Sequence, residues 1–316
     1  MALDIAKGVG ILLVIVGHTA GMKHIGVQLI YCFHMPLFFL IAGYLYHRQD
    51  LKLLCAKSAK RLILPWAIAL LIEILICLVW GRWNDAWGFA QGFLFPDGTR
   101  DDYKWIAGIH SSGAIWFLPA LFWCRIIYAL IEQRFATKSY LVTIPVTLAA
   151  VIFGRYVWNL PLAIQVGCSA LLFYELGYRA NQWQIIECNI PLWIFVLFIP
   201  LCVFYERYVS FEMFWYNYGL TYPIDVLIAA FVTLMVVKIG AWTANVSSLR
   251  LFKYCLAWLG VNSIYILCTH TFFLLVLGYL NESLLWPGWG IILINMCLSI
   301  LTAFVYVRLK FKLCPH

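Results

Sequence analysis

Long apolar runs recur along the chain of 316 residues, and they constrain its fold more than any other feature. Each run has roughly 18 to 24 residues, which as an α-helix crosses a hydrocarbon layer about 30 Å thick. Inside a bilayer the backbone polar groups must find partners within the protein, which helices provide. The composition excludes an ordinary soluble domain, since 64% of the residues are hydrophobic, 11% are charged and the mean hydropathy is +0.89. The sequence therefore predicts an all-α, polytopic transmembrane bundle.

The number and orientation of the spans follow from the positions of the runs and of the basic residues. Of the 22 Lys and Arg residues, fourteen fall in the loops on one side, six on the other, and two within spans. The richer side is expected to face the cytoplasm, which places both termini there. No linker or low-complexity tract separates the runs, so 1–316 is expected to be a single integral-membrane domain. We expect ten spans, at 5–22, 28–46, 62–80, 113–131, 140–158, 161–179, 191–209, 222–240, 255–278 and 288–308.

Several classes of partner and site are not expected. The net charge of +8 does not indicate a nucleic-acid partner, because the basic residues lie in short loops where membrane lipid headgroups and topology explain them. The eleven cysteines occur singly, without a C-x-x-C pair, so neither a disulfide framework nor a cysteine zinc site is indicated. The first run contains Asp4, Lys7 and His18 and is therefore expected to be a true span, not a signal peptide.

Two connections between spans are long. The connection 47–61 alternates basic residues with leucines, which favours a helix in the cytoplasmic interface as much as a plain basic loop that orients the chain. The connection 81–112 is rich in Trp and Phe, which argues against disorder. Two roles stay open for it: a cover over an acceptor site on the outer side, or an aromatic belt that only anchors the protein.

The first span carries three ionisable side chains on one face. A charge at mid-bilayer costs at least about 2.5 to 3.5 kcal/mol on insertion scales, so such residues are candidates for function. At 100° per residue, Asp4, Lys7 and His18 fall within one sector about 60° wide. Asp4 and His18 are about 21 Å apart along the helix axis. The face therefore combines charges at the cytoplasmic end with an imidazole in the outer half of the membrane.

The second span mirrors this arrangement while running in the opposite direction, with His34 in the outer half and Arg48 on the cytoplasmic side. Two histidines at similar depth predict a shared polar cavity, although a lone intramembrane histidine is more often a packing residue. His270 in the ninth span is a third candidate, and Ser263 precedes it by seven residues on the same face. Three histidines could bind a catalytic zinc ion, but no His-x-His or His-x-x-x-His spacing occurs, so no metal is expected.

Five blocks of the sequence occur in an order that resembles the membrane acyltransferase-3 family, particularly its fucose 4-O-acetylase-like branch. The blocks are DIAKGVGILLVIVGH, FHMPLFFLIAGYLY, KSAKRLILPW, IWFLPALF and GVNSIYILCTH. Together they extend over nearly the whole chain, from residue 4 to residue 270. Many family members carry an Arg-Gly pair where this chain has Lys7 and Gly8, a departure that fits the fucose-acetylase branch. The NYG of 217–219 is a weaker match to the same branch.

The resemblance implies an integral membrane enzyme, a carbohydrate O-acetyltransferase of the bacterial cytoplasmic (inner) membrane. Such enzymes move an acyl group, usually acetyl from cytoplasmic acetyl-CoA, to hydroxyls of sugars in envelope polysaccharides or glycolipids. His18 matches the essential histidine of the first helix of the family, and His34 matches the histidine of the second block. Basic residues near the cytoplasmic helix ends are the expected partners of the donor's phosphates. They are Lys7, Arg48, Lys57 and Arg61.

The expected mechanism uses His18 either as the general base for the acceptor hydroxyl or as the carrier of a covalent acetyl group. His34 or Ser263 would donate a hydrogen bond to the developing oxyanion. Asp4 and Lys7 either shape the mouth of the site or form a simple ion pair. A proton-coupled transporter or flippase for a sugar or lipid-linked solute is the rival interpretation, although no inverted repeat is visible. The acceptor sugar and the oligomeric state, a homo-oligomer included, stay open.

Overall fold

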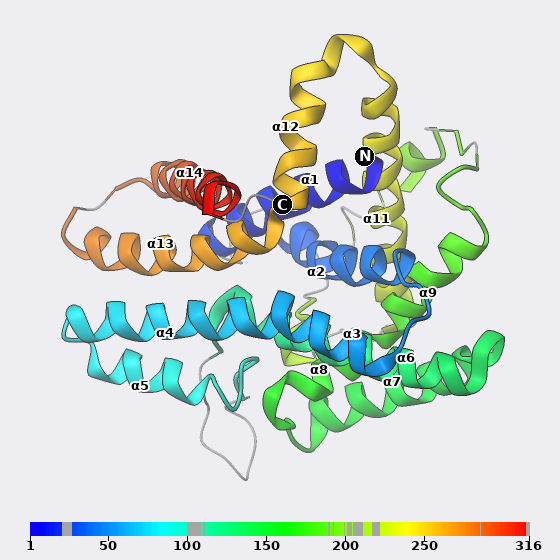
Figure 1. Ribbon diagram of the computed structural model, residues 1–316, viewed down its shortest axis with the longest axis horizontal. Helices are drawn as coiled ribbons and strands as arrows, with labels where there is room; N and C mark the ends of the chain where they lie inside the picture. Colours follow the sequence, from blue (N-terminus) through cyan, green and yellow to red (C-terminus); the bar gives the residue numbers. More distant parts are fainter. Residues whose placement is uncertain are drawn as a thin grey trace.

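The computed structural model describes residues 1–20, 27–99, 109, 111–188, 190, 191, 193–198, 200, 204, 211–216, 222–284 and 286–313. Helices make up the regular structure of these residues, and none of them forms a strand (Figure 1). The α-helices are α1 (Ala2–Ala20), α2 (Val27–Tyr44), α3 (Leu51–Ser58), α4 (Leu64–Val79), α5 (Trp83–Gln91), α6 (Phe117–Phe135), α7 (Tyr140–Tyr156), α8 (Ile164–Ser169), α9 (Leu171–Gln182), α11 (Tyr222–Asn245), α12 (Arg250–Val261), α13 (Ser263–Leu284) and α14 (Gly288–Leu313).

Seven helical segments of the described residues are long and apolar enough to cross a bilayer, so the chain is a multi-pass helical membrane bundle. These segments are α1, α2, Leu51–Val79, Gly113–Lys138, α11, α13 and α14. The expected span 140–158 corresponds to α7, a shorter apolar helix of 17 residues. The expected span 191–209 lies partly outside the described residues. The total of ten spans and the cytoplasmic position of both termini therefore stay predictions.

Two expected spans are each divided into two helices. The expected span 255–278 is interrupted at Asn262, where α12 ends and α13 leaves in a different direction (Figure 1). The Trp258 carbonyl oxygen accepts both the backbone N–H of Asn262, at 3.1 Å, and its side-chain amide, at 2.9 Å. The expected span 161–179 is interrupted at Ala170, between α8 and α9. Apolar composition alone did not reveal these breaks.

The helix at the centre of the bundle is α1, which packs against α2, α11, α12, α13 and α14. Its closest partner is α12, because glycines bring the two backbones together. A Cβ on Gly8 would lie 2.1 Å from the Leu256 carbonyl oxygen, and one on Gly260 would lie 1.8 Å from that of Asp4. Small residues permit such close helix packing in membranes. The contact holds α1 in one rotational position, which determines where its polar face points.

A second close helix pair joins α2 to α9. A Cβ on Gly43 would lie 2.0 Å from the Tyr174 carbonyl oxygen, and one on Gly177 would lie 1.9 Å from that of Leu40. As in the first pair, each helix supplies a glycine and a carbonyl. The position of α2, which carries His34, therefore depends on α9.

The connection 47–61 is helical over most of its length. The Asp50 side chain caps α3 by accepting a hydrogen bond from the Leu53 N–H at 3.0 Å. Leu54 packs against Ile126 and Ala129 of α6, so α3 lies against the protein along one face. It continues through a π-helical turn, Ala59–Ile63, directly into α4.

The described part of the connection 81–112 contains α5, which packs against α4. Trp83 and Trp87 are 70% and 67% exposed, as an aromatic belt requires, whereas Phe95 is buried. Trp105 lies outside the described residues. The end of the connection approaches α13, since a Cβ on Gly113 would lie 3.9 Å from the Thr271 methyl carbon. The exposed tryptophans fit the anchoring role, and the covering role stays a prediction.

A buried carboxyl group joins three connections outside the spans. Asp97 is 0% exposed, and its Oδ2 accepts hydrogen bonds from Asn159 Nδ2 at 2.9 Å and from the Tyr216 hydroxyl at 3.3 Å. Asn159 Nδ2 also donates to the Gly98 carbonyl oxygen at 2.7 Å. Burial raises the pKa of Asp97 to about 7, although these hydrogen bonds act in the opposite direction.

This raised pKa predicts a pH-dependent stability. The folded pKa lies above the unfolded value, so the stabilising contribution is complete below about pH 4 and is lost as the pH rises through 7. We expect the melting temperature of the protein in detergent to fall between pH 5 and pH 8. The Asp97→Asn variant should show a smaller fall, because its amide does not titrate. An equal fall in both proteins would contradict the assignment to Asp97.

The close contact of α2 with α9 predicts a cost for one added methyl group. Gly177→Ala should destabilise the protein by about 1 to 3 kcal/mol, because the new Cβ overlaps the α2 backbone. Gly278→Ala in α13 is the matched control, since nothing lies within 4 Å of the position of its Cβ. Thermal unfolding of both variants in the same detergent measures the difference. A Gly177→Ala variant as stable as the control would contradict the packing.

Candidate active site

The three intramembrane histidines meet at one place, although they come from α1, α2 and α13. The ring centroid of His18 lies 6.0 Å from that of His34 and 5.9 Å from that of His270. His34 and His270 are 2% and 0% exposed. His18 and His34 thus lie close together, with His270 as the third member, whereas the polar cavity that they were expected to share is not lined by any of the three. We call these three residues the histidine cluster.

In two members of the cluster, hydrogen bonds determine which ring nitrogen carries the proton and which one can accept a hydrogen bond. His34 Nδ1 lies 2.7 Å from the Ile30 carbonyl oxygen, and His270 Nδ1 lies 2.6 Å from that of Leu267. A carbonyl oxygen only accepts, so each Nδ1 carries a proton and each Nε2 of the neutral ring is an acceptor. A neutral His34 therefore has no N–H for an oxyanion, which weakens its expected role as a donor.

His18 has a free ring nitrogen and a tyrosine beside the other one. His18 Nδ1 lies 3.5 Å from the Tyr31 hydroxyl, and the Tyr31 ring also contacts the ring of His34, with centroids 5.0 Å apart. His18 Nε2 and His270 Nε2 are buried without a hydrogen-bond partner in the described protein. Leaving a buried polar atom unpaired costs about 1 to 3 kcal/mol, so two such atoms together indicate a site. Sequence reasoning missed Tyr31, which lies one helical turn before His34 and could have been found by that spacing.

Within the described ranges, no group of three His, Cys, Asp or Glu side chains has an arrangement that could hold a metal ion. The two fixed Nδ1 atoms are occupied by carbonyl groups, as often happens when Nε2 is the functional nitrogen.

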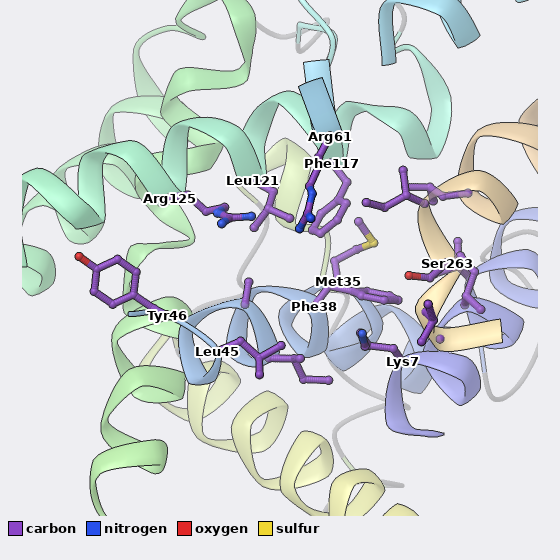
Figure 2. A pocket seen from close by; sticks show the side chains of 18 of the residues that line it. Lys7, Met35, Phe38, Leu45, Tyr46, Arg61, Phe117, Leu121, Arg125 and Ser263 are labelled. Carbon is purple, nitrogen blue, oxygen red and sulfur yellow. The ribbon is translucent and has the colours of Figure 1, made fainter. Parts of the chain in front are cut away.

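A cavity of about 320 Å³ lies between α6 and the three helices that carry the histidine cluster (Figure 2). It is mostly apolar, with a few basic and polar side chains, and no acidic residue lines it. Its walls come from α1, α2, the π-helical turn, α6, the end of α12 and the start of α13, together with residues that follow α2. Among the expected site residues, Lys7, Arg61 and Ser263 line it.

The cavity follows the polar face of α1 toward the cluster. Lys7, Ile11 and Val14 line it at spacings of four and three residues, and His18 is the next position of that stripe. Val14 and His18 are one helical turn, about 6 Å, apart along the axis. The histidines themselves do not line the cavity. The cavity therefore ends about one turn before the cluster.

The π-helical turn directs Arg61 into the cavity. Its wider helical turn contains Lys60 and Arg61, and only Arg61 of this pair lines the cavity. Pro65 follows within the same continuous helical segment, and it has no N–H to donate to a carbonyl oxygen of the π-helical turn. Such π-helical turns occur often at functional sites. No feature of the sequence pattern distinguishes this turn from an ordinary α-helix.

The remaining expected cations have other surroundings. Lys7 Nζ lies 2.9 Å from Asp4 Oδ1, so its charge is partly compensated within α1. Arg48 donates to the Gln133 carbonyl oxygen at 3.3 Å and does not line the cavity. Lys57 is exposed and does not line the cavity either. Ser263 lies in the cavity wall, seven residues before His270, and not beside the cluster.

An arginine that sequence reasoning did not select also lines the cavity. Phe117, Leu121 and Arg125 of α6 face it at successive intervals of four residues. Figure 2 shows Arg125 and Arg61 pointing into the same space on either side of Leu121, with Lys7 on the opposite wall. The spacing could have grouped these three residues, but it could not have shown what the stripe faces.

The chain matches a known protein family over nearly its full length. The model of the acyltransferase-3 family, described as an acyltransferase domain, matches residues 2–308. This range includes the histidine cluster and every residue that lines the cavity. Neither a curated protein nor a solved structure matches the chain.

Proposed function

Because the chain belongs to the acyltransferase-3 family, we propose that it transfers an acetyl group from acetyl-CoA to a sugar hydroxyl of an envelope polysaccharide or glycolipid. The fucose 4-O-acetylase-like branch and the bacterial inner membrane are parts of this proposal. The observation that carries it is the single α1 stripe from Lys7 through Ile11 and Val14 to His18, since it joins a basic cavity to an imidazole. A donor molecule with an anionic end and a reactive end needs both a basic cavity and an imidazole.

The donor enters the cavity from the side of its basic residues. CoA carries its phosphates at the nucleotide end, and guanidinium groups bind phosphate through paired, charge-assisted hydrogen bonds. Arg61 is exposed and lines the cavity, so it can meet these phosphates where the nucleotide stays in water. The excess of Lys and Arg on this side of the chain makes it the cytoplasmic side in our proposal.

The pantetheine arm then follows the apolar cavity toward the cluster. Lys7 and His18 are eleven residues, about 17 Å, apart along α1, a distance within reach of an extended arm. To pass the final helical turn beyond Val14, the arm requires side chains to move. Met35, the residue after His34, lines the cavity there. Methionine suits this position because its three rotatable bonds let it change shape at low cost.

His18 acts as the general base in the proposed reaction. The acceptor oxygen attacks the thioester carbonyl, its proton passes to His18 Nε2, the carbon–sulfur bond breaks, and the CoA thiolate leaves and takes up the proton. His18 Nδ1 donates to the Tyr31 oxygen in this arrangement, which keeps the lone pair on Nε2. The acceptor approaches from the opposite end of the cluster, where Gly113, directly after the connection 81–112, lies near Thr271, the residue after His270 in α13.

The His18→Ala variant tests the proposed role of His18 as the general base. Acetyl transfer from labelled acetyl-CoA to an acceptor glycan should fall by about two to four orders of magnitude, the usual contribution of a positioned base. Binding of CoA to the variant should stay close to wild type, because His18 does not line the cavity. Transfer at the wild-type rate would remove His18 from the chemistry.

Tyr31→Phe tests the orientation of the His18 ring. The variant keeps the ring packing and loses one hydrogen bond to Nδ1, so kcat should fall about tenfold, with little change in the KM for acetyl-CoA. Steady-state kinetics at saturating acceptor separates the two constants. A KM effect alone would show that Tyr31 serves donor binding.

Arg61→Ala and Arg48→Ala form a matched pair for the donor site. Both remove one guanidinium group near the same membrane surface, but only Arg61 lines the cavity. Arg61→Ala should raise the KM for acetyl-CoA roughly tenfold or more, and Arg48→Ala should change it much less. Equal effects would contradict the cavity as the donor site.

A further inference from the structure

Arg125 occupies a position that is costly for a cation. It lies within α6, in a segment long and apolar enough to span the membrane. An arginine at such a depth costs at least about 2.5 kcal/mol on insertion scales, so it normally has a partner or a function. Arg179 illustrates the usual solution, because its guanidinium donates to Glu175 Oε1 and to the Thr137 carbonyl oxygen, each at 2.7 Å.

No such solution is present at Arg125. Its Nε is buried without a hydrogen-bond partner, and no ion pair joins it to any side chain that the structure describes. No acidic side chain lines the cavity that it faces. Lys7, the other cation of the cavity wall inside a span, has Asp4 as its partner. Arg125 and Arg61 therefore supply the uncompensated positive charge of the cavity.

Packing of α3 and of the π-helical turn against α6 holds these two arginines on neighbouring elements. Ile126, the residue after Arg125, packs with Ala129 against Leu54 of α3. The π-helical turn that contains Arg61 follows α3 directly and also packs against α6. The same contacts that join α3 to α6 therefore bring both guanidinium groups to one side of the cavity (Figure 2).

We propose that Arg125 and Arg61 together bind the diphosphate group of the nucleotide donor. This inference rests on the proposed function and adds a binding residue to it. Two planar guanidinium groups on separate elements can each pair with one phosphoryl group, and a diphosphate presents two such groups linked by a single oxygen. The buried Nε of Arg125 then gains the acceptor that the protein does not provide.

Three ligands of graded chemistry test the assignment by binding to the purified full-length protein. CoA has both the diphosphate and the 3′-phosphate, dephospho-CoA has only the diphosphate, and pantetheine has neither. Arg125→Gln should weaken CoA and dephospho-CoA by a similar factor, roughly tenfold to a hundredfold in Kd, and leave pantetheine unchanged. Arg125→Lys should retain part of the affinity, since lysine keeps the positive charge but lacks the planar pair of N–H donors of a guanidinium group.

Arg134→Gln is the matched control, because Arg134 lies on the same helix, is exposed and does not line the cavity. It should bind all three ligands as the wild type does. Melting temperatures without ligand identify a variant that fails to fold, in which case Arg125→Lys carries the test. Wild-type CoA affinity in the Arg125→Gln variant would overturn this inference and leave the proposed function standing. A loss for CoA without a loss for dephospho-CoA would also overturn it, whereas a wild-type protein that binds neither nucleotide would overturn the proposed function as well.

Discussion

The structure depends on the direct backbone contact between α1 and α12. Gly8 and Gly260 leave no room for a side chain between the two helices, so α1 cannot rotate without breaking this contact. Since α1 also packs against α2, α11, α13 and α14, its rotation sets the direction of the stripe that ends at His18. A site assembled from separate helices can be rigid only if their relative rotation is fixed, and here two glycines fix it.

The same packing explains how ionisable groups persist in a chain that is 64% hydrophobic. Glu175 and Arg179 neutralise each other, and Lys7 pairs with Asp4, so these charges cost little where they lie. The histidine cluster and Arg125 keep unpaired buried nitrogens. Charges of the first kind compensate each other within one helix, and polar groups of the second kind oppose folding unless a ligand or a reaction uses them.

Helical periodicity explains why much of the site could be predicted. It placed His18 on the same face as Lys7, and the mirrored second span brought His34 to the same depth. Periodicity does not say which helices are neighbours. Ser263 shares a face with His270 but lies in the cavity wall, and Arg125 has a regular spacing that gains meaning only from its surroundings. The break at Asn262 was missed although its signal is local, because asparagine is a common residue at helix C-terminal ends and here bonds back to Trp258.

The π-helical turn at Ala59–Ile63 has a consequence for how such a site can change over time. A turn of this kind accommodates one more residue than an α-helix does, as a single inserted codon would produce. Loss of one codon there would restore the α-helix with little rotation of α3 relative to α4, because five π-helical residues and four α-helical residues turn through nearly the same angle. α3 would keep its packing against α6, and the side chains of the turn, Arg61 among them, would change direction. One short deletion could therefore turn a cation out of the cavity while every helix of the bundle remained intact.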